Sequence, residues 1–164
     1  MVYGKEITLE TEGFSKSYDI TADVASVVAD SGITGGLVNI FSIGSTASIS
    51  TIEYEPALVK DLEDQLEELI PAAKTTRHGS TWGDDNGFSH LRATLMGPGI
   101  TVPVHSCRLV LGTWQQIILV DHDNRPRSRR VFVQVMGDSH VALSVCRQKS
   151  NRAPRACRLQ TGYP

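Results

Sequence analysis

Alternating apolar and polar residues dominate the first third of the chain, and this pattern predicts strands. Residues 2–9 and 14–19 follow the two-residue period of a half-buried strand, with Gly13 at a turn between them. Residues 36–41 and 47–53 are rich in Val, Ile, Ser and Thr, which favour pleated structure. We therefore predict two strands joined by a turn, followed later by two neighbouring strands.

Two segments change to the period of a helix. After Thr21, which suits an N-cap, three valines fall on one helical face, and Gly32 suits the left-handed residue after the last turn. Pro56 suits the first turn of a longer helix that ends before Pro71. The apolar stripe of this second helix consists of Leu58, Leu62, Leu66 and Leu69.

The second half of the chain has five short strand-like runs, separated by Gly, Pro and Asn. They are residues 90–96, 100–104, 109–111, 116–121 and 130–136. This order of elements predicts an α+β fold with a mostly antiparallel, sandwich-like β core and two helices packed on one side.

Charge divides the chain into a domain and a tail. Residues 1–138 carry all eighteen acids and eleven of the sixteen Lys and Arg residues, a formal charge of −7. Residues 139–164 carry no acid and five basic residues, without helical or strand period. We expect one domain over residues 1–138 and a disordered basic tail over residues 139–164. Five charges without interleaved aromatic residues give little support for nucleic-acid binding.

The composition also limits the location and the class of the protein. There is no basic leader followed by an apolar core, and no apolar run approaches the roughly 18 residues of a membrane span. Cys107, Cys146 and Cys157 form neither a CxxC pair nor an even set, which implies neither a disulfide framework nor a thiolate zinc site. We expect a cytoplasmic protein with reduced cysteines and no membrane partner.

Residues 77–92, RHGSTWGDDNGFSHLR, are the strongest candidate for a site, because a polar loop can direct catalytic groups into a cleft. His78 and His90 lie at its two ends, with Asp85 and Asn86 between them. Imidazole and carboxylate together suit zinc, whereas carboxylates with a substrate phosphate suit magnesium. The alternative is a loop whose Asp and Asn side chains cap turns.

Three further groups could take part in catalysis. Glu53 ends a strand and could transfer a proton or anchor a metal-bound water, or it could be a solvated strand end. Ser45 and Thr46 follow Gly44 in a turn that could bind a phosphate. If residues 90–96 form a strand, Arg92 shares a face with His90 and could bind an oxyanion.

For two other segments, the sequence is compatible either with ligand binding or with a purely structural role. Trp114 and Gln115 lie at a strand junction, where the indole could stack on a heteroaromatic substrate or pack in a core or a subunit interface. The arginines of DNRPRSRR, residues 123–130, could bind phosphate or nucleic acid, or form a solvated hairpin. Common cofactor and hydrolase signatures, such as GxGxxG, GxxxxGK[ST], GxSxG and HExxH, are absent.

Several segments together resemble the YjbQ-like family. They are GSTASISTIEYEP, RHGSTWGDDNGFSHLRA, LMGPGITVPV, LGTWQQIILVDHDNRPRSR and VFVQVMGD, which span almost all of residues 1–138. The resemblance implies a small α+β fold that assembles as a homotrimer. It also implies a secondary thiamine-phosphate synthase activity, which joins hydroxymethylpyrimidine diphosphate to thiazole phosphate and releases diphosphate.

The chain departs from the family pattern at Phe88, where the family often has a histidine two residues before His90. A metal site that used this pair would lose a ligand. Residues after Ser139 also lie outside the pattern and inherit nothing from it.

The resulting hypothesis is a thiamine-phosphate synthase that acts on phosphorylated small molecules, and it stands beside two alternatives. These are a metal-dependent hydrolase and a non-catalytic trimeric protein that binds a phosphometabolite. The expected catalytic residues are Glu53, His90 and Arg92. The expected substrate-binding residues are Ser45, Thr46, His78, Asn86, Trp114 and Gln115. A divalent metal, Mg or Zn, would be held by His78, Asp85 and His90.

Overall fold

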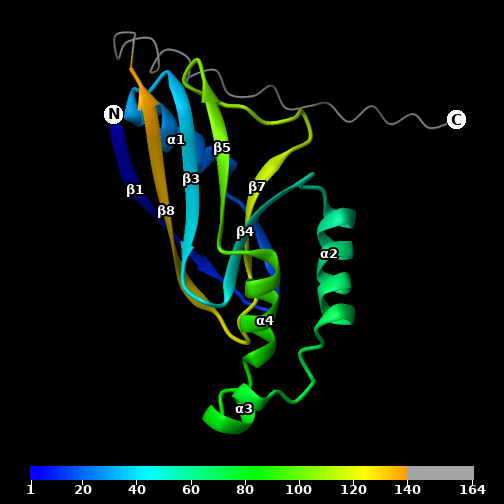
Figure 1. The fold of residues 1–164 in the computed structure, drawn as a ribbon. Coiled ribbons are helices and arrows are strands. Elements are labelled where there is room, and N and C mark those ends of the chain that lie inside the picture. The colour runs from blue at the N-terminus through cyan, green and yellow to red at the C-terminus, as the bar shows by residue number, and fades with distance from the viewer. Residues whose placement is uncertain (140–164) are drawn as a thin grey trace, which may run out of the picture.

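A computed structural model describes residues 1–139 of the 164-residue chain, so the expected basic tail lies outside the described residues except for Ser139. The described part contains eight strands and four helices (Figure 1). The strands are β1 (Val2–Thr11), β2 (Lys16–Asp19), β3 (Gly35–Ile43), β4 (Ala47–Ile52), β5 (Gly99–His105), β6 (Arg108–Leu109), β7 (Gln116–Asp121) and β8 (Arg127–Asp138). The helices are α1 (Thr21–Ser31), α2 (Pro56–Leu69), α3 (Arg77–Trp82) and α4 (Gly87–Met96).

The strands form two antiparallel sheets. The first has the order β1-β8-β3-β5-β6, and the second has the order β2-β7-β4. Every pairing is antiparallel, and the long β1–β8 ladder joins the two ends of the domain, from Val2 opposite Met136 to Thr11 opposite Arg127. The predicted α+β fold with an antiparallel, sandwich-like core is therefore confirmed. The expected pairing of residues 36–41 with residues 47–53 is wrong, because β3 and β4 lie in different sheets.

Strand β7 explains how the core is built. Ile117 and Leu119 face the core between the sheets, whereas Ile118 and Val120 face a second core formed with Leu66 of α2. All four side chains are fully buried, and burial of one such side chain contributes about 1.5–3 kcal/mol. Because both faces of β7 are covered, its sequence is a continuous apolar run rather than an alternating one.

The first two helices lie where they were expected, although Thr21 is the first residue of α1 and Ile20 is its N-cap. Helix α1 packs its valines into the core between the sheets and ends at Gly32, which has the left-handed φ of 67°. Helix α2 has Pro56 in its first turn, and the Glu55 side chain accepts hydrogen bonds from the amides of Ala57 and Leu58. In Figure 1, α2 and α4 lie beside β4 and β7, away from α1. The helices thus do not all share one side of the sheets.

The expected strand at residues 90–96 is wrong, because this segment belongs to α4. Phe88, Ser89, Arg92 and Ala93 are buried, at the i, i+1, i+4 and i+5 spacing of one helical face. The run LRATLM is also rich in good helix formers. Together with α3, this raises the number of helices in the described chain from the expected two to four.

Cys107 lies in the turn between β5 and β6, whereas Cys146 and Cys157 lie outside the described residues, so the expectation of reduced cysteines stays a prediction. None of the helices in residues 1–139 combines the length and the apolar character needed to cross a bilayer.

Candidate functional site

The polar segment at residues 77–92 folds as two short helices that pack against each other at their starts. The Thr76 hydroxyl accepts a hydrogen bond of 3.0 Å from the Gly79 amide, and Gly83 ends α3 with a φ of 71°. A β-carbon placed on Gly87 would lie 2.0 Å from the Thr76 hydroxyl oxygen. Glycine is therefore required at position 87 for the start of α4 to approach α3 this closely.

This packing brings His78 of α3 against His90 of α4. The centroids of the two imidazole rings are 4.7 Å apart, and the ring planes are inclined by 56°. His78 Nε2 lies 3.3 Å from the Asp84 carboxylate. Two residues separated by twelve positions in the sequence thus form one imidazole pair with a carboxylate at its edge.

Asn86, which is buried, completes this group. When its amide is rotated so that the nitrogen faces the neighbouring acceptors, it lies 3.3 Å from both His78 Nε2 and the Asp84 carboxylate. His78 Nε2 can donate to Asp84 when it carries a proton, or accept from Asn86 when it does not. We call His78, Asp84, Asn86 and His90 the histidine cluster.

A cavity of about 480 Å³ opens beside the histidine cluster, between the end of α2 and the helices α3 and α4. We call it the α2–α4 pocket. Its apolar lining consists of Leu69, Ile70, Pro71, Phe88 and Leu91. Its basic lining consists of Lys74, Arg77, His78 and His90. The volume falls within the range of about 300–1,000 Å³ that is typical of small-molecule sites.

The expected metal trio does not converge in one copy of the chain. A β-carbon placed on Gly79 would lie 3.2 Å from the Asp85 carboxylate, so Asp85 faces α3, and Asp84 is the acid beside His78. Within residues 1–139, no group of three His, Cys, Asp or Glu side chains is arranged to hold a metal ion.

Arg92 lies behind the pocket rather than in it. Its guanidinium donates to the Ile70 carbonyl at 2.6 and 3.0 Å, to the Ser15 hydroxyl at 2.8 Å and to the Glu67 carboxylate at 2.5 Å. It also lies 5.0 Å from the centre of the Phe88 ring. The expectation that Arg92 and His90 share a face is wrong, because positions i and i+2 of a helix point in different directions.

These contacts make Arg92 a support for the pocket wall. Ile70 and Phe88 both line the α2–α4 pocket, and Arg92 joins them from behind. The hydrogen bond from Arg92 lowers the pKa of Glu67 below its usual value, so this carboxylate stays charged and paired. The end of α2 is thereby fixed to α4.

His122, which was not among the expected site residues, is fully buried next to Arg92. Ser15 and Ser48 lie 2.9 and 3.1 Å from its two ring nitrogens, and Ser89 donates to its main-chain carbonyl at 2.6 Å. Burial, with a further contribution from Arg92, lowers its pKa to about 4. A polar DHD sequence, which begins at the last residue of the apolar strand β7, was the signal that could have identified this residue.

Thr46 belongs to a second polar group, which lies under the bend between β3 and β4. Its hydroxyl donates to Asp123 at 3.1 Å and accepts from Arg129 at 2.9 Å. Arg129 also donates to both oxygens of the buried Asp121 carboxylate, at 2.5 and 2.9 Å. The Thr46 hydroxyl is therefore engaged within the protein, whereas the neighbouring Ser45 is exposed.

Asp123 is held as a carboxylate in this group. Burial acts to raise its pKa, but hydrogen bonds from Arg127, the Asn124 amide and Thr46 outweigh burial, and the pKa is lowered overall. The side-chain amide of Asn124 donates to the Asp84 carbonyl at 2.8 Å. This bond joins the loop between β7 and β8 to the histidine cluster, and in Figure 1 both lie at the lower end of the molecule.

Glu53, Trp114 and Gln115 lie at the opposite end of the β4–β7 ladder. The register runs from Ala47 opposite Asp121 to Ile52 opposite Gln116, five steps that span about 17 Å at the usual rise of a strand. Gln115 donates to the Thr51 hydroxyl at 3.0 Å, and Trp114 is exposed. One copy of the chain therefore does not by itself gather Glu53 with His90.

Comparison with known proteins identifies the family of this chain. A family model described as "UPF0047 protein YjbQ-like" matches residues 5–138. A UPF0047 protein of Methanothermobacter thermautotrophicus is 41% identical over 136 residues, which cover 83% of this chain and 93% of the relative. A UPF0047 protein of Archaeoglobus fulgidus is 37% identical, with coverages of 80% and 99%.

Solved structures give the same result. A YbjQ-like protein of unknown function from Sulfolobus solfataricus P2 superposes with a TM-score of 0.80 at 35% identity, covering 84% of this chain and 99% of that chain. A hypothetical protein from Aeropyrum pernix K1 has a TM-score of 0.78 at 30% identity, with coverages of 83% and 99%.

Proposed function

The chain belongs to the YjbQ-like UPF0047 family, and from this premise we propose that it is a transferase of the thiamine-phosphate synthase type that acts in the α2–α4 pocket. The observation that carries the proposal is the division of the pocket lining. Apolar side chains can cover a heterocyclic ring, and four basic side chains border the same cavity, where a diphosphate would need charge compensation.

The reaction requires little covalent chemistry from the protein. The ring nitrogen of thiazole phosphate attacks the exocyclic methylene of hydroxymethylpyrimidine diphosphate, a C–N bond forms, and the C–O bond breaks with its electron pair leaving on diphosphate. The nitrogen is already nucleophilic, so no enzyme nucleophile is required. Catalysis then consists of orienting the two substrates and stabilising the departing charge.

We assign these tasks to particular residues of the pocket. Lys74 and Arg77 supply fixed positive charge for the diphosphate, and His78 and His90 supply ring N–H donors beside it. Arg92, expected to bind phosphate itself, instead holds the pocket wall through Ile70. Glu53 has no part in this pocket within one copy.

We propose that a divalent cation enters with the substrate. Mg²⁺ usually keeps several waters and binds through substrate phosphates with one or two carboxylates, rather than in an all-protein cage. Asp84 is the exposed carboxylate at the edge of the pocket that suits this role. Since the substrates are intracellular metabolites, the proposal also includes a cytoplasmic location.

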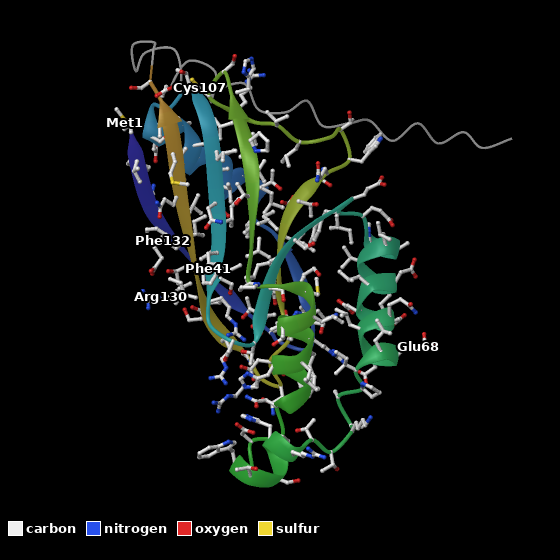
Figure 2. The ribbon with its side chains drawn as sticks, viewed as in Figure 1. Met1, Phe41, Glu68, Cys107, Arg130 and Phe132 are labelled. Carbon is white, nitrogen blue, oxygen red and sulfur yellow. The ribbon has the colours of Figure 1, made fainter. Side chains whose placement is uncertain are left out.

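The proposed homotrimer has a surface that suits contact between copies. On the face of the first sheet that points away from the core, Leu37, Phe41, Phe132 and Met136 are exposed. Phe41 and Phe132 are directly paired across β3 and β8, and Figure 2 labels them on neighbouring strands. An exposed apolar patch of this kind is typical of a protein–protein interface.

The test is to mix the protein with the two thiamine precursors, with and without Mg²⁺, and to follow thiamine phosphate by mass spectrometry. We expect product with the wild type and a loss of about 10²-fold in kcat for His90→Ala, the size seen when a charge-stabilising donor is removed. His105→Ala, an exposed histidine on β5, serves as the control and should keep full activity.

The two alternative functions give different results in the same experiment. A hydrolase releases phosphate or diphosphate from one substrate alone and depends on a bound metal with an open water position. A binding protein retains the ligand and returns it unchanged. Either result, or equal turnover by wild type and His90→Ala, would overturn the proposed role of the α2–α4 pocket.

A further inference from the structure

We infer that the bend between β3 and β4 and the arginines at the start of β8 form a second anion-binding site, which takes a single phosphate group. The site consists of Gly44, Ser45, Arg125, Arg127 and Arg129, and we call it the arginine bend. Its assignment to the second substrate rests on the proposed function, whereas phosphate binding itself does not.

The bend offers main-chain donors. Gly44 and Ser45 are both exposed, and within residues 1–139 their amides donate to no protein acceptor. Gly44 has a φ of 154°, in the range that favours glycine. Successive free amides at a bend, with a serine hydroxyl beside them, are a recurring arrangement for binding anions.

Arg129 places a fixed guanidinium under this bend. Its Nε and Nη2 atoms are held by Asp121, Thr46 and Asp123, as described above. The remaining nitrogen, Nη1, would lie 3.5 Å from a β-carbon placed on Gly44. One edge of the guanidinium therefore donates hydrogen bonds within the protein. The other edge faces the bend and has N–H donors available.

Arg125 and Arg127 are the two further basic residues at the loop before β8 and at its first position. Arg127 uses its Nε atom for Asp123 at 2.7 Å, and about a third of its side chain, 32%, is exposed. Arg125 is exposed and makes no ion pair in the described part of the chain. Both guanidinium groups therefore have donors available, in the planar arrangement that matches a phosphate.

The acids of this group do not repel an incoming anion as exposed acids would. Asp121 and Asp123 are buried, and their oxygens accept hydrogen bonds from Arg129, Arg127 and Thr46. They offset the charge of two arginines and hold these side chains in place, which leaves the charge of Arg125 without a partner. Preorganised donors of this kind bind an oxyanion at low entropic cost.

A single phosphate fits the charge of the molecule better than nucleic acid does. Residues 1–138 carry a formal charge of −7, which disfavours a long polyanion. The arginine bend also lies on the same end of the molecule as the α2–α4 pocket, because Asn124 joins the two through Asp84. One pocket for a diphosphate and one bend for a monophosphate match a reaction with two phosphorylated substrates.

The test is a titration of the folded protein with inorganic phosphate, followed by ¹H–¹⁵N NMR. We expect saturable shifts of the Gly44 and Ser45 amides, with a dissociation constant raised about tenfold in Arg127→Gln, the effect of losing one charge-assisted hydrogen bond. Arg130→Gln is the matched control, because Arg130 is also on β8 but is paired with Glu6. The Arg130→Gln substitution removes the same charge and should leave the dissociation constant for phosphate unchanged.

Three results would overturn the site: no shift at Gly44 and Ser45, an equal loss of binding in Arg130→Gln, or tighter binding of a short RNA to the same amides. The assignment to the second substrate is tested separately. In Arg127→Gln the KM for thiazole phosphate should rise and the KM for the pyrimidine diphosphate should not. If the wild type binds phosphate at the bend but makes no thiamine phosphate, the site stands and the proposed function fails.

Discussion

Asn124 and Asp84 are joined by a hydrogen bond of 2.8 Å from the side-chain amide of Asn124 to the main-chain carbonyl of Asp84. This contact spans forty positions in the sequence and connects the loop after β7 to the loop before α4. Because Asp84 meets His78 and Asn124 precedes Arg125, the same contact connects the α2–α4 pocket to the arginine bend.

Asn124→Ala should therefore impair the proposed reaction more than it impairs folding. We expect the free energy of unfolding to fall by about 1 kcal/mol, the usual net contribution of one hydrogen bond. We expect kcat to fall by about tenfold or more, because the two substrate sites lose their fixed relation. Gln65→Ala, which removes an exposed amide from α2, should change neither quantity. Equal kcat for Asn124→Ala and wild type would show that the connection has no role.

Arg92→Ala should loosen the pocket wall. It removes a buried side chain and leaves the Ser15 hydroxyl and the Ile70 carbonyl without their donor, so we expect a loss of about 2–4 kcal/mol in chemical denaturation. Glu67→Gln should cost less than about 1 kcal/mol, because the Glu67 side chain is half-exposed. Arg92→Lys should restore part of the lost stability and should bring the KM part of the way back to the wild-type value. An Arg92→Ala protein with normal KM would contradict the supporting role.

Gly87→Ala tests the close approach of α3 and α4. The added β-carbon would meet the Thr76 hydroxyl at 2.0 Å and the Thr76 β-carbon at 2.7 Å, so the helices must move apart. Overpacking of this kind costs about 1–3 kcal/mol, and the His78–His90 pair should separate. Gly112→Ala is the control, since its nearest neighbour would lie at an ordinary 3.7 Å. Equal thermal midpoints for the two variants would refute the steric argument.

His122 should make the protein less stable in mild acid. Burial lowers its folded pKa to about 4 from the usual 6.5, with Arg92 and Arg129 also lowering it and Asp121 opposing them. Between these two values the unfolded chain binds a proton that the folded chain does not, so the free energy of unfolding falls as the pH falls. The slope for one such group is about 1.4 kcal/mol per pH unit.

The measurement is urea denaturation between pH 6.5 and pH 5, where most carboxylates remain charged. His122→Gln keeps a donor and an acceptor for Ser15 and Ser48 but has no proton to gain. Its stability should change less over this range than that of the wild type. The same slope in both proteins would show that His122 is not the group responsible.

Phe132→Asp tests the proposed contact between copies. Phe132 packs over Gly4 on the outer face of the first sheet, where a β-carbon on Gly4 would lie 2.7 Å from the ring. A buried carboxylate at an interface is costly, so we expect sedimentation to show monomers in place of trimers. Leu95→Asp, an exposed leucine on α4, should keep the assembly. A trimer that survives Phe132→Asp would place the interface elsewhere.

The sequence by itself determined much of the scaffold. The two-residue period gave the strands, the valines before Gly32 gave α1, and the leucine stripe after Pro56 gave α2. These elements bury one face each, so their periods directly reflect their surroundings. The same reasoning misplaced residues 90–96, because a ten-residue helix that begins on Asn-Gly and follows a polar loop offers too little periodicity to separate it from a strand.

Only the tertiary structure decided which polar residues meet. The sequence identified His78 and His90, but it grouped them with Glu53 and Arg92. In the fold, Glu53 lies at the far end of β4, and Arg92 lies behind the pocket wall. It did not identify His122 at all. Contacts such as Asn124 with Asp84 depend on packing between segments distant in the chain, and no local period records them.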